Sequence, residues 1–198
     1  MIYLFDDMEN ISADVISETF ALMPHERRQR SLRYKREIDR YCCVLAYWLL
    51  LNGLKNEYGI TDPPVFTYGE NGKPYLDGHP DIFFNLSHCK EGVVCVISNV
   101  EIGVDIQDVR PFSIDVAKRV CTSNELERIS RSREPERLFC EIWTIKESFI
   151  KQQGGSITQS LKMLDAHKLF EQVNSKKICH WGKRYHLCCI GEEMINED

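Results

Sequence analysis

Apolar and polar residues recur with two different periods along this chain, which predicts a fold of both helices and strands. Residues 1–5 and 65–68 are short apolar runs with the length of a strand. A helix is expected from about residue 24 to residue 54, with a break near residue 34. Its later part, residues 41–51, is apolar on every side, which is typical of a largely buried helix.

Strand-like runs are concentrated in the middle and at the end of the chain. Residues 82–86 are a strand candidate, and residues 93–98 and 102–106 are rich in β-branched residues. Only three residues separate the last two runs, which predicts a hairpin near the centre of the chain. The tail, residues 178–190, alternates like a final hairpin.

Three further helices are expected between these strands. They start near residue 114, at the Ser/Asn-rich turn of residues 122–124, and near residue 135. The last of them should stop at the two glycines of residues 154–155. The pattern predicts an α+β fold in which two similar halves, each with strand, helix and hairpin-like elements, meet near residue 100.

The helix expected from residue 135 carries an array of functional side chains. At 3.6 residues per turn, Trp143, Glu147 and Lys151 fall on one stripe, and Lys146 lies a small rotation away. A carboxylate is thereby set between two cations. Taken alone, Glu147 and Lys151 would be a surface ion pair worth about 0.3 kcal/mol.

A second acidic position lies in the strand expected at residues 102–106. The apolar residues of this strand point to one side, so Asp105 and Gln107 point to the other. Together with Glu147 they can bring two carboxylates and one amide carbonyl oxygen to the same place.

These two segments resemble the signature of the 4′-phosphopantetheinyl transferases, which move phosphopantetheine from coenzyme A to a carrier-protein serine. That signature is a Gly-hydrophobe-Asp strand, here residues 103–105, followed by a Trp-x-x-Lys-Glu-Ser/Ala-x-x-Lys helix, here residues 143–151. Two more stretches resemble the larger, single-chain type that activates surfactin synthetase. They are Gly-Lys-Pro at residues 72–74 and Asn-Leu-Ser-His at residues 85–88.

The resemblance implies a fold, a reaction and a metal. The fold would be a pseudo-dimer of two α/β halves, residues 1–100 and 101–198, with the active site in the cleft between them. The substrates would be coenzyme A and an apo acyl or peptidyl carrier protein, and the products the holo carrier protein and 3′,5′-ADP. The metal would be Mg²⁺, with Mn²⁺ as its substitute.

Asp105 and Glu147 are the metal ligands that the resemblance implies. Mg²⁺ commonly takes one or two carboxylates and fills its octahedron with phosphate oxygens and water. Family members often carry a second acid two positions after the strand aspartate, where this chain has Gln107. Gln107 is therefore expected to be a weaker metal ligand.

Phosphoryl transfer requires mainly positioning and electrostatic stabilisation, and that assigns further roles. Glu147 is the expected general base toward the carrier serine. Lys151, and with less weight Lys146, should stabilise the pyrophosphate charge. By resemblance, Ser87 and His88 contact the coenzyme A phosphates, and His88 is also a catalytic candidate.

A cationic surface is expected near the start of the first long helix, because residues 26–40 hold seven basic and three acidic residues. By resemblance, Arg27, Arg30 and Arg40 bind the 3′-phosphate of coenzyme A. Lys73, in a turn, is expected to reach the same phosphate. The remaining basic side chains of this segment should form a solvated helix face.

Composition bounds these interpretations. The 198 residues carry a formal net charge of −5, which argues against general nucleic-acid binding. The longest apolar run, residues 42–51, is about half the length of a membrane span. Nine cysteines without a CxxC pair, and a start without a signal-peptide pattern, predict a cytoplasmic protein. A single chain with both halves of the site is expected to be a monomer.

Two other functions stay open at this point. A metal-dependent coenzyme A pyrophosphohydrolase could use the same two carboxylates, and a non-catalytic module could bind coenzyme A or a carrier protein. The missing acid at Gln107 suggests the second. The tail also holds residues that could be taken for zinc ligands, namely Cys179, His180, His186, Cys188 and Cys189. Their alternating spacing, without a CxxC or HxxxH pair, does not favour zinc.

Overall fold

The structure, a computed structural model, describes residues 1–155, 161–169 and 175–192. The first part of the chain forms β1 (Ile2–Phe5), α1 (Ala13–Leu22), α2 (His25–Leu32), α3 (Glu37–Tyr58), β2 (Phe66–Tyr68), β3 (Pro74–Leu76), β4 (Phe83–Cys89) and β5 (Gly92–Ser98). The second part forms β6 (Ile102–Asp108), α4 (Ile114–Val120), α5 (Ser123–Arg131), α6 (Pro135–Gln152), a short 3₁₀ helix (Leu161–Met163), β7 (Ser175–Trp181) and β8 (Tyr185–Glu192). The mixed α+β class expected from the sequence is confirmed.

Local sequence explains where several helices begin and end. The side chains of Ser12, Ser113 and Thr122 accept backbone hydrogen bonds at the starts of α1, α4 and α5. At the start of α5, Glu125 completes a capping box with Thr122. Helix α3 ends at Gly59, whose φ of 68° is readily adopted only by a residue without a Cβ.

Two antiparallel three-stranded sheets form the centre of the molecule. Their strand orders are β1-β5-β4 and β6-β8-β7, so in each sheet the first strand pairs with the last, and the last pairs with the one before it. Strands β2 and β3 form a separate two-stranded ribbon. The long helices α3 and α6 each pack on one of the two large sheets.

The prediction that residues 93–98 and 102–106 form a hairpin is wrong. Strand β5 pairs with β1 and β4, whereas β6 pairs with β8 in the other sheet. Both strands are apolar and β-branched, and that composition suits neighbours in one sheet and facing strands of two packed sheets equally well.

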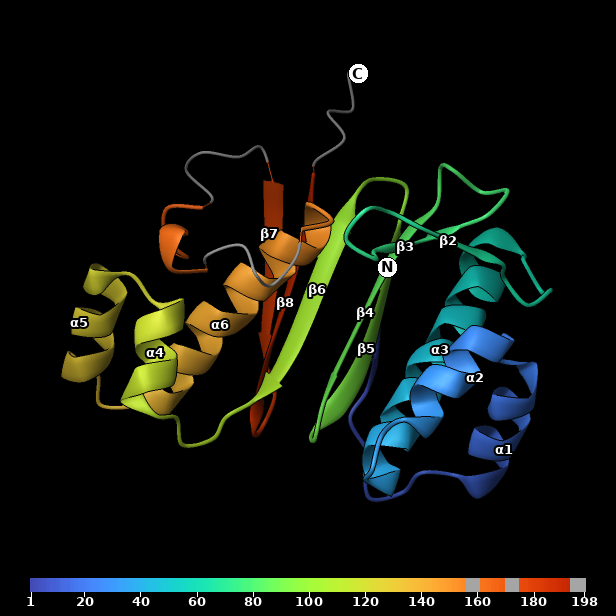
Figure 1. The fold of residues 1–198 in the computed structure, drawn as a ribbon, viewed down its shortest axis with the longest axis horizontal. Helices are drawn as coiled ribbons and strands as arrows, with labels where there is room; N and C mark the ends of the chain where they lie inside the picture. The colour runs from blue at the N-terminus through green and yellow to red at the C-terminus, as the bar shows by residue number, and fades with distance from the viewer. Residues whose placement is uncertain (156–160, 170–174, 193–198) are drawn as a thin grey trace.

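The two sheets pack face to face, and helices cover their outer faces (Figure 1). Alternate residues of β5 enter different cores: Val93, Cys95 and Ile97 contact the layer of α3, while Val94 and Val96 join the core between the sheets. Strand β8 behaves in the same way. Both strands therefore have no polar face, in contrast to the half-solvated strands of a single-layer sheet.

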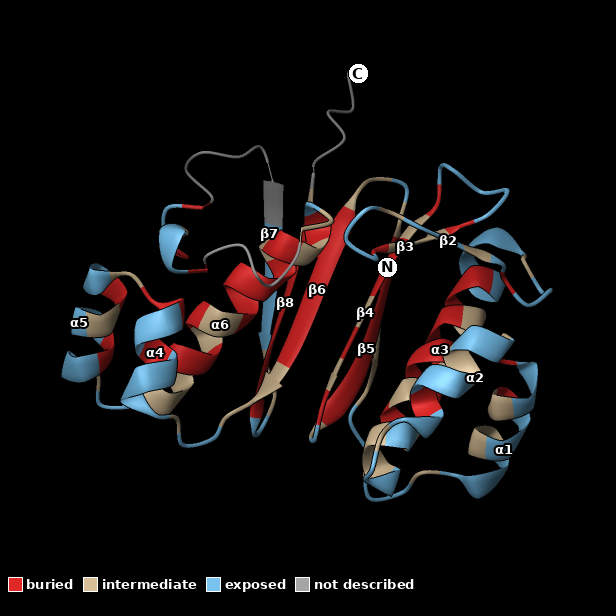
Figure 2. Ribbon diagram, in the orientation of Figure 1, coloured by how far each residue is buried: buried red, intermediate tan, exposed pale blue. Residues whose placement is uncertain are grey.

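Buried residues run along the strands and the inner faces of α3 and α6, and the outer sides of α1, α2, α4 and α5 are exposed (Figure 2). Within the described ranges, no helix combines the length and apolarity that crossing a membrane requires.

Candidate active site

Helix α6 lies directly against β6, and a glycine makes this contact possible. A Cβ atom on Gly103 would lie 2.1 Å from the carbonyl oxygen of Ser148 and 2.3 Å from the amide nitrogen of Gln152. Both atoms belong to the helix backbone, so a side chain at this position would push the helix away. The close contact sets Glu147 and Lys151 of α6 beside Asp105 of β6.

The two carboxylates of this site are buried. Asp105 is 6% exposed and Glu147 4% exposed. The Oδ1 atom of Asp105 accepts hydrogen bonds from Ser87 Oγ at 2.7 Å and from Lys151 Nζ at 2.6 Å. Burial, and next the charge of Asp105, raise the pKa of Glu147, while Lys151 acts in the opposite direction.

Two oxygens of these carboxylates have no partner among the described residues. They are Asp105 Oδ2 and Glu147 Oε1, and both are buried. An unpaired buried anionic oxygen is costly, which indicates a missing cation or donor. The part of the chain that the structure describes contains no cluster of three or more His, Cys, Asp or Glu side chains. A pair of carboxylates fits Mg²⁺, which binds few protein ligands and keeps several sites for phosphate and water.

A cavity of about 550 Å³ opens in front of the carboxylates and is lined by both parts of the chain. Arg27, Arg30 and His88 line it from the first part, and Trp143 and Lys151 from the second. Three of these side chains, Arg27, Arg30 and Lys151, are cationic, although the formal charge of the whole chain is −5. Such a cavity suits a polyanion that also coordinates a divalent ion.

Of the three arginines predicted to bind a phosphate, the two on α2 line the cavity, whereas Arg40, on α3, does not. Arg27 lies over aromatic rings, with its guanidinium carbon 4.4 Å from the centre of the Phe66 ring, and burial lowers its pKa. Arg30 lines the same wall. Arg40 is not among the lining residues, and its Nε donates to the carbonyl oxygen of Tyr34 at 2.8 Å. Tyr34 does line the cavity, so Arg40 supports its rim.

Ser87 and His88 lie on β4, where the two sheets meet. Ser87 Oγ donates to Asp105 and accepts from the backbone amide of Ile106 at 3.3 Å and from Lys151 at 3.1 Å. Burial, and next the charge of Lys151, lower the pKa of His88. A neutral imidazole can donate one hydrogen bond and accept another at this wall.

Lys146, predicted with less weight than Lys151 to stabilise a pyrophosphate, does not face the cavity. Consecutive helix residues are rotated by about 100°, so Lys146 turns into the core while Glu147 faces the cavity. Its ammonium is fully buried and donates to Glu125 Oε2 at 2.5 Å and to the carbonyl oxygen of Val120 at 2.8 Å. Lys146 holds α5 against α6 and does not line the cavity.

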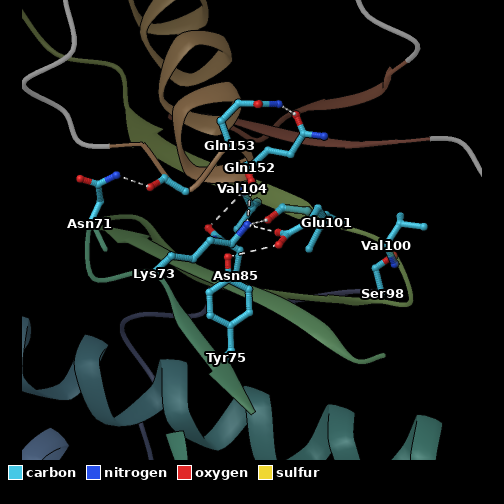
Figure 3. Close-up of polar contacts among 12 residues, drawn as sticks. Asn71, Lys73, Tyr75, Asn85, Ser98, Val100, Glu101, Val104, Gln152 and Gln153 are labelled. Carbon is cyan, nitrogen blue, oxygen red and sulfur yellow. Dashed lines mark hydrogen bonds and ion pairs between the residues drawn. The ribbon is translucent and has the colours of Figure 1, made fainter. Parts of the chain in front are cut away.

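Lys73 lines the cavity with its stem, but its ammonium is not free. The side chain is buried, and Nζ donates to the carboxylate of Glu101 and to the carbonyl oxygens of Ile102 and Gln152 (Figure 3). The ammonium was expected to be free to reach a phosphate, and here it is bound to three acceptors of the protein itself. Glu70, Asn71 and Gly72 of this turn are exposed, whereas the Lys73 side chain turns inward to the other part of the chain.

Gln107 faces a second, smaller cavity beyond Trp143. Its amide nitrogen lies 3.4 Å from Asp108 Oδ1, and it lines a space of about 200 Å³ together with Phe112 and Phe139. Trp143 contributes to both cavities. Gln107 is close along β6 to Asp105 but does not line the main cavity.

The cysteines and histidines of the tail form no zinc site within the described ranges. Cys179 and Cys188 are directly opposite on β7 and β8, with their sulfur atoms 3.5 Å apart. His186 contacts Thr144 of α6 through Nδ1 and packs on Trp181. These side chains support the packing of β8 against α6.

Several residues at the cavity did not stand out in the sequence. Asn85, inside a recognised motif, accepts a hydrogen bond from the amide of Val104 at 3.2 Å and so ties β4 to β6. Tyr34 and Asn71 line the cavity from turns. Turn residues carry no periodic signal, and only the position of Asn85 beside Ser87 could have drawn attention to it.

Comparison with known proteins finds similar sequences. A family model described as the 4′-phosphopantetheinyl transferase superfamily matches residues 101–193. The chain is 31% identical to a 4′-phosphopantetheinyl transferase of Bacillus subtilis over 156 residues, which cover 76% of this chain and 69% of the relative. It is 30% identical to the transferase Sfp of B. subtilis strain 168, covering 69% and 62%. With the transferase gsp of Aneurinibacillus migulanus it shares 36% identity, covering 65% and 55%.

Proposed function

The chain belongs to the 4′-phosphopantetheinyl transferase superfamily, and on this premise we propose the reaction that its cavity performs. The protein transfers the 4′-phosphopantetheine group from coenzyme A to a serine of an apo acyl or peptidyl carrier protein and releases 3′,5′-ADP. The observation that carries this proposal is the pair of buried carboxylates, Asp105 and Glu147, each with an unpartnered oxygen, at the end of a cationic cavity.

The carboxylates would hold Mg²⁺, with Mn²⁺ as its substitute, through Asp105 Oδ2 and Glu147 Oε1. When bound, the ion would neutralise pyrophosphate charge. Gln107, on the same face of β6 as Asp105, would contribute from the edge of the site, in a weaker role than an acid. Lys151 and Ser87 already fix the other oxygen of Asp105, which orients its carboxylate.

Glu147 would accept the proton of the carrier serine hydroxyl as that hydroxyl attacks the phosphorus bearing pantetheine. Burial and the charge of Asp105 raise its pKa, which makes it a better proton acceptor than an exposed glutamate. Lys151 and His88 would stabilise the charge that develops on the leaving 3′,5′-ADP. The stripe of Trp143, Glu147 and Lys151 on α6 places these groups along one wall.

The arginines of the first part of the chain would bind the 3′-phosphate. Arg27 and Arg30 line the cavity wall opposite α6, and Arg40 would contribute from the rim. Guanidinium groups match the geometry of phosphate oxygens, and a partly buried position strengthens the attraction.

The architecture would be a pseudo-dimer of residues 1–100 and 101–198 with the active site in the cleft between them. This is supported by the identical strand orders of the two sheets and by a cavity lined from both parts. A chain that carries both halves of its site can act as a monomer. Nine free cysteines support a reducing compartment, the cytoplasm.

The test is the intact mass of an apo acyl carrier protein after incubation with this protein, coenzyme A and Mg²⁺. We expect a mass gain of one phosphopantetheine group. Glu147→Gln should abolish it, whereas Glu141→Gln, an isosteric change on the same helix away from the cavity, should not.

Two results would contradict the proposal. Release of 4′-phosphopantetheine from coenzyme A in the absence of a carrier would indicate a pyrophosphohydrolase. Binding of coenzyme A without transfer to several acyl and peptidyl carrier proteins, in excess Mg²⁺ or Mn²⁺, would indicate a binding module.

A further inference from the structure

Lys73 connects two distant parts of the chain beside the cavity. It precedes β3, and its side chain is only 5% exposed. Its ammonium group donates to the carbonyl oxygen of Gln152 at 2.7 Å, to that of Ile102 at 3.3 Å and to the carboxylate of Glu101 (Figure 3). A lysine ammonium has three N–H donors, and all three are used here.

The acceptor on α6 explains why a cation is placed here. Gln152 is the last residue of α6, and its carbonyl is one of the four that a helix end leaves without an intrahelical partner. A positive charge at this end also interacts favourably with the helix dipole. Lys73 thus caps the C-terminus of a helix that lies some distance along the chain.

Neighbouring contacts strengthen the same connection. Asn71 Nδ2 donates to the carbonyl oxygen of Gly154 at 2.9 Å, just after the end of α6. Tyr75 donates its hydroxyl to Glu101 Oε1 at 3.2 Å. Figure 3 shows Asn71, Lys73 and Tyr75 reaching from the turn and β3 to this helix end and to Glu101.

A phosphate-binding role would require Lys73 to leave all three acceptors. The carbonyl oxygen of Gln152 would then lose its donor, and the carboxylate of Glu101, which is 36% exposed, would lose its ion pair and keep only the hydroxyl of Tyr75. Unpaired polar groups in a buried position cost more than a surface ion pair gains.

We propose that Lys73 is a positioning residue that clips the turn of residues 69–74 to the end of α6 and the start of β6, and that it does not bind the phosphates. Lys151 directly precedes Gln152, and Asp105 lies three residues after Ile102. The clip therefore holds both groups at a defined distance from the opposite wall of the cavity. Its effect on catalysis rests on the function proposed above.

Two substrates distinguish a clip from a phosphate ligand. With coenzyme A and 3′-dephospho-coenzyme A, a residue that positions the site should affect both reactions alike. We expect Lys73→Met to lower kcat/KM about tenfold for each, so that the preference for coenzyme A is unchanged. A ligand of the 3′-phosphate should instead lose activity with coenzyme A only, as we expect for Arg30→Met.

Changing Glu101, the ion-pair partner of Lys73, gives an independent test. Glu101→Gln leaves the lysine in place but weakens its anchor. A clip predicts that this variant resembles Lys73→Met in kcat/KM, and that the double variant is no worse than either single one. If Lys73 instead bound a phosphate, Glu101→Gln would remove the carboxylate that competes for its ammonium. Coenzyme A binding would then be unchanged or tighter. Lys90→Met, at an exposed lysine outside the cavity, is the matched control.

Thermal unfolding separates this proposal from the proposed reaction. Lys73→Met and Glu101→Gln should each lower the Tm by about 5 °C, and the double variant by no more than about that amount. If the wild type transferred no phosphopantetheine, the proposed reaction would be rejected. The positioning role of Lys73 would then be tested by the Tm values alone. An unchanged Tm in both variants, or a loss of preference for coenzyme A in Lys73→Met, would overturn it.

Discussion

Replacing Lys146 by methionine tests whether this lysine of α6 stabilises the fold or binds the substrate. Methionine keeps most of the length and apolar surface of the stem but removes the ammonium. The change deletes hydrogen bonds of 2.5 Å to Glu125 and 2.8 Å to the carbonyl oxygen of Val120. Both charged partners are buried, at 0% and 1% exposure, so water cannot replace the lost contacts.

The loss of unfolding free energy is set by the carboxylate of Glu125, which stays buried after its cation is removed. Removing one partner of a buried ion pair typically costs 3–5 kcal/mol, because the other charge stays buried without compensation. Glu125 retains two donors, the backbone amides of Thr122 and Ala166 at 2.7 and 2.8 Å, which places the loss near the lower end, at about 3 kcal/mol. For a chain of this size that corresponds to a fall in Tm of about 6–12 °C.

The assay combines thermal unfolding with kinetics well below the Tm. Lys146→Met should unfold earlier, yet its KM for coenzyme A should stay close to the wild-type value. Lys151→Met, on the same helix but facing the cavity, should show a raised KM for coenzyme A. Lys118→Met, at an exposed lysine of α4, should change neither quantity. A Lys146→Met variant with an unchanged Tm and a raised KM would refute the assignment of Lys146 to the core.

Three other predictions concern single side chains. Because burial and Lys151 lower the pKa of His88 below its usual 6.5, the folded state binds this proton less readily than the unfolded chain, and stability is lost as the pH falls. The Tm difference between wild type and His88→Gln should therefore rise from about pH 5 to pH 7, and the opposite slope would contradict this. The hydrogen bond with Cys188 lowers the pKa of Cys179, which is an exposed thiol. Iodoacetamide should therefore alkylate Cys179 first in the native protein, which peptide mapping would detect. Earlier reaction of another cysteine would contradict this prediction. Gln107→Glu should lower the Mg²⁺ concentration for half-maximal rate, since it adds a carboxylate on the face of Asp105; an unchanged requirement would place Gln107 outside the metal site.

Local patterns predicted the elements well, because each depends on neighbours in the chain. The break between α2 and α3, the helix α6 and the final hairpin of β7 and β8 follow from periodicity and turn residues. Helix α1 was not predicted, and its residues carry only a weak amphipathic pattern. The stripe on α6 was visible for the same local reason, as i and i+4 positions share a face.

Partners far apart in the sequence explain the errors. Lys73 lies in a turn and resembles a solvated lysine, but its acceptors are 28, 29 and 79 positions away. Lys146 and Lys151 are both lysines of one motif, and only the position of α5 decides that Lys146 is enclosed. The pairing of β6 with β8, rather than with β5, likewise depends on a strand from the end of the chain.

The contact at Gly103 has a consequence for anyone who wishes to transplant this site. The separation of the two carboxylates is set by backbone lying on backbone, without any side chain acting as a spacer. Grafting Asp105, Glu147 and Lys151 onto another strand and helix would therefore fail unless that scaffold allowed an equally close approach. For protein design, the minimal portable unit is the packed strand and helix together with their glycine.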